Sequence, residues 1–207
     1  MSPADCLSAS AIQASLGECV IGCRIIVLQS TRSTNDFLLQ MLTPGLPEGF
    51  VVFAEEQTAG RGQRGNRWAS AAYLGLWFSI LLRPQLPLTE TARLTKWAAE
   101  AVAVTIARET GLEPTVKLPN DIYLSGRKVA GVLVETKSRS GQVIAAVVGI
   151  GVNVNHAAED FPVDLRERAG SLAMALEGRI DRTAFAIALL RELERTRVSL
   201  RCHPEPA

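Results

Sequence analysis

The chain has 207 residues, 47% of them hydrophobic and 21% charged, which is ordinary globular composition and suits one domain. Its net charge of +1 excludes a general attraction to nucleic acid, so we expect no DNA partner and only local contacts to small anions. No apolar run reaches the roughly 18 residues of a membrane span, and the start lacks a signal-peptide pattern, so we expect a cytoplasmic protein with no membrane partner.

The first part of the chain predicts short strands and one helix. Strands are expected near 24–29, 50–54 and 73–82, where apolar and β-branched residues gather between turn residues. The segment Ser33-Thr34-Asn35-Asp36 is typical of a helix start, because the Ser33 side chain can accept a backbone hydrogen bond from the first turn.

The second part predicts two helices and more strands. Apolar residues at helical spacing indicate a helix over 89–110 that ends at Gly111, and Asp181 begins a closing helix within 181–200. Three strands, joined by turns at Gly126 and Gly141, are expected over 116–118, 128–135 and 143–154. We therefore predict one α+β domain over 1–207, with a mixed, mainly antiparallel sheet packed by helices.

The loop Gly60-Arg61-Gly62-Gln63-Arg64-Gly65-Asn66-Arg67-Trp68 is the first chemical motif. It matches the spacing of a dinucleotide fingerprint, but that fingerprint needs a helix at the glycines, and here a strand is expected instead. Its flexible backbone and three guanidinium groups suit forked contacts with a carboxylate or a phosphate. A solvated basic loop without a ligand is the alternative that the residues alone leave open.

Three further features carry polar groups between or within strands. The segment Lys117-Leu118-Pro119-Asn120-Asp121 places a cation, an amide and a carboxylate about a turn. Lys128 opens an apolar segment, where its charge needs solvent or a partner. Gly149 and Gly151 interrupt the last strand, and either a close approach to the backbone or a β-bulge explains them.

The cysteines and histidines do not form a pattern that predicts zinc. No two cysteines are spaced as Cys-x-x-Cys, and both histidines lie far along the chain from the closest cysteine pair. These residues are Cys6, Cys19, Cys23, Cys202, His156 and His203. We expect reduced thiols without a structural metal.

Taken together, the motifs between about 30 and 155 resemble those of biotin protein ligases. The matching stretches, in order, are Ser33-Thr34-Asn35, 55–68, 117–135 and 149–154. The resemblance implies the catalytic fold of the biotin/lipoate protein ligases, with biotin and ATP as substrates together with Mg²⁺. It implies that biotin is activated as biotinyl-5′-AMP and transferred to a lysine of an apo biotin carboxyl carrier protein. It is also compatible with a homodimer in which two chains pair through a sheet edge.

The resemblance assigns roles to individual residues. Contacts to biotin are implied for Ser33, Thr34, Gln57, Gly60, Arg61, Gln63, Trp68, Lys128, Gly131, Gly149 and Gly151. Contacts to ATP are implied for Arg64, Arg67, Trp68, Lys117, Asn120, Asp121 and Asn153, with Asn153 also near Mg²⁺. Lys128, Arg61 and Arg64 are implied as catalytic cations, because the biotin carboxylate and the α-phosphate repel each other until cations screen them. Asp121 has two open roles, one towards the nucleotide and one towards the incoming lysine.

This chain departs from the pattern of biotin protein ligases at one loop position and in its expected domains. Many family members have arginine where this chain has Gln63, so we expect faster escape of the adenylate. No helix-turn-helix domain is expected before the core, and the small C-terminal domain of relatives is expected to be absent. A lipoate ligase and a non-catalytic binding module remain alternatives. An apolar dithiolane is expected to leave Thr34 and Gln57 unpaired, which favours biotin.

Overall fold

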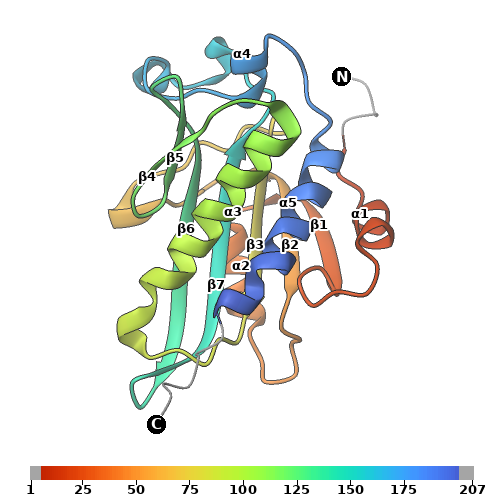
Figure 1. The fold of residues 1–207 in the computed structure, drawn as a ribbon, viewed down its shortest axis with the longest axis vertical. Coiled ribbons are helices and arrows are strands. Elements are labelled where there is room, and N and C mark those ends of the chain that lie inside the picture. The colour runs from red at the N-terminus through yellow and green to blue at the C-terminus, as the bar shows by residue number, and fades with distance from the viewer. Residues whose placement is uncertain (1–5, 201–207) are drawn as a thin grey trace.

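The computed structural model describes residues 6–200, which contain one seven-stranded sheet in the order β1-β2-β3-β7-β6-β5-β4 (Figure 1). The strands are β1 (Arg24–Thr31), β2 (Phe50–Gln57), β3 (Gly75–Leu82), β4 (Thr115–Lys117), β5 (Asp121–Leu124), β6 (Arg127–Arg139) and β7 (Gln142–Asn153). β1 is parallel to β2, and the other neighbouring strands pair antiparallel. The predicted mixed, mainly antiparallel sheet is confirmed.

The α-helices of the described residues are α1 (Ala9–Leu16), α2 (Thr34–Met41), α3 (Ala92–Thr110), α4 (Leu172–Leu176) and α5 (Arg182–Thr196). Three predicted helix ends are confirmed, since Ser33 caps α2, Asp181 caps α5, and Gly111 ends α3 in the left-handed conformation with φ 71°. The start of α3 differs, because the helix expected from 89 begins at Ala92. The sequence did not predict α1 or α4, because each is short and buries a single residue. None of the described helices is long and apolar enough to cross a membrane.

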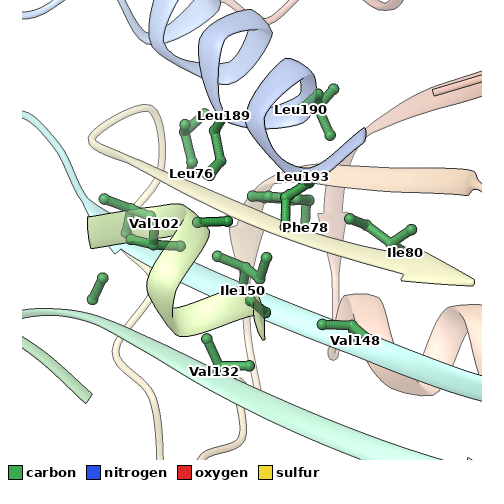
Figure 2. Packing of buried hydrophobic residues seen from close by; sticks show 14 of the residues in the cluster. Leu76, Phe78, Ile80, Val102, Val132, Val148, Ile150, Leu189, Leu190 and Leu193 are labelled. Carbon is green, nitrogen blue, oxygen red and sulfur yellow. The ribbon is translucent and has the colours of Figure 1, made fainter. Parts of the chain in front are cut away.

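Two α-helices pack on one face of the sheet. In Figure 1, α3 and α5 lie across this face, and Figure 2 shows Leu76, Phe78 and Ile80 of β3 pointing into the core that these helices cover. Val102 of α3 and Leu189 of α5 meet them there. Burial of each such side chain contributes about 1.5–3 kcal/mol, so this face supplies most of the hydrophobic stabilisation.

The opposite face is covered only in part. The short helix α2 packs Leu38 on a smaller apolar cluster that includes Val147 of β7. Because side chains alternate along a strand, the next residues of β7 on this face are Gly149, Gly151 and Asn153. The face thus changes from apolar to small and polar as β7 leaves the cover of α2, and a site can form there.

The hairpin turns that join β5 to β6 and β6 to β7 follow the prediction. Ser125-Gly126 and Ser140-Gly141 have positive φ at both central residues, as tight hairpin turns require. The expected turn over 117–121 is shorter than predicted, because Asp121 already belongs to β5, a strand that was not predicted. β5 has only four residues, too few for a clear alternating pattern.

His156 is buried among aromatic rings. Its side chain stacks on Phe161 with the ring centroids 4.9 Å apart and meets Trp77 edge-on at 5.7 Å. The residue is 2% exposed, and neither ring nitrogen finds a hydrogen-bond partner among residues 6–200. Burial lowers the pKa of His156 from 6.5 to about 4, and the nearby charge of Asp160 offsets only part of this effect.

This histidine should make the stability of the fold depend on pH. The unfolded chain takes up a proton as the pH falls through 6.5, whereas folded His156 stays neutral down to about 4. The free energy of unfolding should therefore fall between these values, by about 3 kcal/mol from this group alone. In His156→Phe, the free energy of unfolding, measured with urea, should fall less between about pH 7 and about pH 4.5 than in the parent chain. An equal fall in both proteins would contradict this role.

Candidate functional site

Two adjoining cavities lie on the partly covered face, lined by described residues. The larger holds about 690 Å³ and extends to the segment 161–169. The smaller holds about 50 Å³ and lies beside the first residues of α2 and the glycines of β6 and β7. Gln57, Trp68 and Lys128 line both cavities, so these three residues stand where the cavities meet.

The glycine- and arginine-rich loop folds back on itself. Trp68 N–H donates to the Gly60 carbonyl at 2.9 Å, and Gly62 N–H donates to the Asn66 carbonyl at 2.7 Å. At the tip, Arg64 and Gly65 both have positive φ, 56° and 78°, within a three-residue 3₁₀ turn. The loop is therefore a small hairpin and not the start of an α-helix, as expected.

A β-bulge places Lys128 on the site face. Asp121 pairs with Gly131, but two residues further along β5 the partner of Tyr123 is Lys128, because the register shifts between Ile122 and Tyr123. Strict alternation would put Lys128 and Gly131 on opposite faces of β6, and the extra residue brings them to the same side. The sequence pattern did not reveal this bulge.

Lys128 is held by four neighbours, two at its side chain and two at its backbone. Its Nζ lies 2.6 Å from Asp121 Oδ1 and 5.2 Å from the centre of the Trp68 ring. Its backbone N–H donates to the Arg168 carbonyl at 2.8 Å, and its carbonyl accepts from Gly170 N–H at 2.9 Å. The segment that rims the larger cavity thus fixes the backbone of Lys128, while Asp121 and Trp68 fix the position of its ammonium group.

Thr34 and Gln57 of the smaller cavity are paired within the protein. Gln57 Oε1 accepts hydrogen bonds from Thr34 N–H at 2.9 Å and from Thr34 Oγ1 at 3.2 Å, and Gln57 Nε2 donates to Ser70 Oγ at 2.9 Å. Ser79 Oγ lies 2.7 Å from Thr34 Oγ1. The expectation that Thr34 and Gln57 need a polar ligand to be paired is wrong, and it no longer separates biotin from lipoate.

The three strand glycines are required by neighbouring side chains. A Cβ at Gly131 or Gly151 would lie 2.9 Å or 2.7 Å from the ring of Trp68, and a Cβ at Gly149 would lie 2.2 Å from Asn35 Oδ1. The resemblance implied that a ligand approaches the backbone of these glycines closely. In the structure, the side chains of Trp68 and Asn35 make this approach. Of the alternatives left open at these positions, close packing against the backbone is the one that the structure shows.

Arg61 does not point freely into the site. Its guanidinium bonds Asp36 of α2 and both carboxylate oxygens of Glu135 on β6. Burial favours loss of its proton, but the Glu135 and Asp36 carboxylates outweigh burial and raise the pKa of Arg61. No motif in the sequence predicts a role in the site for Asp36 or Glu135, because their pairing with Arg61 joins segments far apart in the chain.

The residues expected to contact biotin largely meet in one place. Ser33, Thr34, Gln57, Arg61, Gln63, Trp68, Lys128, Gly131, Gly149 and Gly151 line the smaller cavity, and Gly60 lines the larger one. The residues expected to contact ATP are more dispersed. Arg67, Trp68, Asp121 and Asn153 line the larger cavity, Asn120 lines the smaller one, and Arg64 and Lys117 line neither. Arg64 lies at the exposed loop tip, and Lys117 lies over the Tyr123 ring at 5.8 Å.

Sequence reasoning missed several residues of the larger cavity. Tyr123, Phe161, Asp164 and Arg168 line it, and three of them come from the segment after β7, which carries no motif. Their only signal in the sequence is an aromatic residue within a charged stretch, which is too common to single out.

The carboxylates of the larger cavity do not form a metal cage. No group of three or more histidine, cysteine, aspartate or glutamate residues within 6–200 could hold a metal ion, and Cys202 and His203 lie outside that range. Asn153 is 5% exposed, and its amide nitrogen donates to the Gly170 carbonyl at 2.9 Å. Only its side-chain oxygen is then available to a cation.

Comparison with known proteins identifies the family. The model of the Biotin/lipoate A/B protein ligase family matches residues 27–153, which is more than half of the chain and includes both cavities up to Asn153. The chain belongs to this family. The resemblance inferred from the motifs is confirmed.

Individual members of the biotin/lipoate protein ligase family are similar to this chain in sequence. The bifunctional ligase/repressor BirA of Bacillus subtilis is 39% identical over 176 residues, which are 85% of this chain and 54% of that protein. The biotin–[acetyl-CoA-carboxylase] ligase of Paracoccus denitrificans is 41% identical over 132 residues, which are 62% of this chain and 53% of that protein. The chain spans about half the length of these curated relatives.

Solved structures of the family share the fold. The biotin protein ligase from Aquifex aeolicus, solved in complex with biotin and ATP, has a TM-score of 0.73 and 28% identity. The match covers 86% of this chain and 72% of that one. The predicted α+β catalytic fold of the biotin/lipoate protein ligases is therefore confirmed.

Proposed function

We propose that this chain is the catalytic part of an ATP-dependent ligase that joins biotin to a lysine of an apo biotin carboxyl carrier protein. The observation that carries the proposal is the meeting of the two cavities at Lys128, under the loop that begins at Gly60. One cavity is small and lined by the predicted biotin residues, and the other is large enough for a nucleotide. The ligand set of the Aquifex aeolicus structure, biotin and ATP, supports this division.

In the first step, the biotin carboxylate attacks the α-phosphate of ATP and pyrophosphate leaves. Both reactants are anions, so Lys128 would neutralise charge where they meet, and Asp121, 2.6 Å away, would hold it there. Arg67 and Asn153 would contact the nucleotide, which brings Mg²⁺ with its phosphates, as is usual for this cation. In the second step, the neutral amine of the carrier lysine attacks the acyl carbon, an amide forms and AMP leaves.

Trp68 controls how much room biotin has. The smaller cavity holds about 50 Å³, whereas ligand sites usually hold about 300–1,000 Å³, so a ligand must displace a side chain. Trp68 lies against Gly131 and Gly151, and its Nε1 is buried without a hydrogen-bond partner in the described part of the chain. Moving the indole would break no hydrogen bond of Nε1 and would join the two cavities.

One assay tests the function. The protein is mixed with ATP, Mg²⁺ and an apo carrier domain, biotin or lipoate is supplied, and pyrophosphate release and carrier labelling are followed. Biotin-dependent pyrophosphate release with biotin on the carrier is the expected result. Transfer of lipoate instead would select a lipoate ligase, and biotin binding without labelling would select a non-catalytic binding module.

Gln63 should determine how well the adenylate is retained. It lines the smaller cavity, and glutamine lacks the charge and the fork that arginine offers to a phosphate. Gln63→Arg should slow the escape of biotinyl-adenylate roughly tenfold, measured by filtration of the complex without a carrier. Gln63→Lys, which adds charge without the fork, should have a smaller effect. Equal retention by the parent chain and Gln63→Arg would rule the role out.

A further inference from the structure

Two carboxylates bind Arg61 near the start of the loop 60–68. We propose that Asp36 and Glu135 form a latch, here called the carboxylate latch, which binds Arg61 and keeps the loop 60–68 against the sheet. The position of the loop against the sheet follows from the contacts of Arg61. Its consequence, slow escape of the activated intermediate, rests on the proposed function. Asp36 and Glu135 are positioning residues in this proposal, because they act through Arg61.

The geometry ties three parts of the fold together at one guanidinium group. Arg61 Nη2 lies 2.6 Å from Asp36 Oδ1 and 2.6 Å from Glu135 Oε2, and Nη1 lies 3.0 Å from Glu135 Oε1. Asp36 belongs to the first turn of α2 and Glu135 to β6. A forked contact of this kind fixes the direction of the arginine as well as its charge, and therefore fixes the base of the loop.

The Glu135 carboxylate is oriented by a buried amide. Asn35 Nδ2 donates to Glu135 Oε2 at 2.8 Å, and Asn35 Oδ1 accepts from Ser79 Oγ at 2.6 Å. Asn35 is 3% exposed and packs on Gly149, where a Cβ would lie 2.2 Å from its Oδ1. Gly149 thus makes room for Asn35, and Asn35 sets the carboxylate that receives Arg61. Because each polar group of this network has a hydrogen-bond partner, the network fixes the orientation of the Glu135 carboxylate.

The latch is weak enough to open. The side chains of Arg61, Asp36 and Glu135 are 38%, 37% and 27% exposed, so solvent and salt screen their attraction. An exposed pair of this kind changes an equilibrium by a small factor, which allows substrates to enter and the loop to close again. Salt sensitivity is therefore a property that the latch predicts and that apolar packing of the loop does not.

The first test uses the free protein and does not depend on any activity. Trypsin can cut the loop after Arg61, Arg64 or Arg67 when it opens. Asp36→Asn and Glu135→Gln should each raise the initial rate of cleavage roughly threefold, and the double variant roughly tenfold. The parent chain at about 1 M NaCl should approach the rate of the double variant. Glu109→Gln, an exposed residue of α3 far from the loop in the sequence, is the matched control and should be cut at the rate of the parent.

The outcomes are distinct. Unchanged cleavage in Asp36→Asn and in the double variant, with no effect of salt on the parent, would overturn the latch. If Glu135→Gln does not fold, Asp36→Asn and the salt series still decide. The second test measures escape of biotinyl-adenylate by filtration, where the double variant should lose it roughly tenfold faster. Faster cleavage with unchanged escape would overturn the consequence, whereas no adenylate from the parent chain would count against the proposed function and leave the latch standing.

Discussion

Lys128→Ala should lower the rate of biotinyl-adenylate formation about 10²–10³-fold, the range seen when one group that stabilises the transition state is removed. The lysine lines both cavities, so its charge lies where the carboxylate and the phosphate of the proposed reaction would meet. Asp121 would then lose the partner that lies 2.6 Å from its Oδ1 and would add a negative charge to the site, which would raise the barrier further. Pyrophosphate release with biotin, ATP and Mg²⁺ measures the effect.

The matched control is Lys137→Ala, because Lys137 lies on the same strand, β6, and is exposed. It should keep the parent rate. Loss of Lys128 also unpairs Asp121, and the double variant Lys128→Ala with Asp121→Asn removes that charge. If the double variant unfolds at the same urea concentration as the parent and still makes adenylate slowly, the lysine itself is required. Pyrophosphate release at the parent rate in Lys128→Ala would refute the assigned role.

Elements with local signals were predictable from the sequence. A helix that begins at Ser33 or Asp181 is specified by a side chain that bonds the first turn, and a hairpin at Gly126 or Gly141 by a residue that tolerates positive φ. These signals act within a few residues, so the sequence alone contains them. The same holds for the apolar run of β3, whose Leu76, Phe78 and Ile80 lie in the core against α3 and α5.

The features that position the site were not predictable, because they join distant segments. The bulge that turns Lys128 to the site face depends on how β5 and β6 pair, and no residue type marks it. Arg61 was expected to serve a ligand, and its two carboxylate partners come from α2 and β6. Gly149 was explained by a ligand, and the side chain it accommodates, Asn35, lies on another element. The spacing of the motifs was enough to select these residues as site candidates, but the contacts they make depend on how distant segments pair in the fold.

Arg182→Ala should destabilise the fold by about 3–5 kcal/mol, the cost of leaving one partner of a buried ion pair without the other. Arg182 and Glu55 have side chains that are 1% and 0% exposed, and Arg182 Nη1 lies 2.9 Å from Glu55 Oε2. The same nitrogen donates to the Gly75 carbonyl at 3.0 Å, while Glu55 Oε1 accepts from Leu7 N–H at 2.6 Å. Removal of the arginine would leave a buried carboxylate with its remaining contact too weak to balance its charge. Urea unfolding measures the loss.

The paired variant separates loss of the ion pair from loss of packing. Arg182→Met together with Glu55→Gln keeps the volume, removes both charges and still offers an acceptor to Leu7, so it should be more stable than Arg182→Ala. A loss below about 1 kcal/mol in Arg182→Ala would show that the pair does not hold α5 to the sheet. Glu55 lies two residues before Gln57 on β2, and Gln57 bonds Thr34 in the smaller cavity. The pair that fixes α5 therefore also fixes the strand that supplies the proposed biotin pocket, and Arg182→Ala should weaken biotin binding even where the protein remains folded.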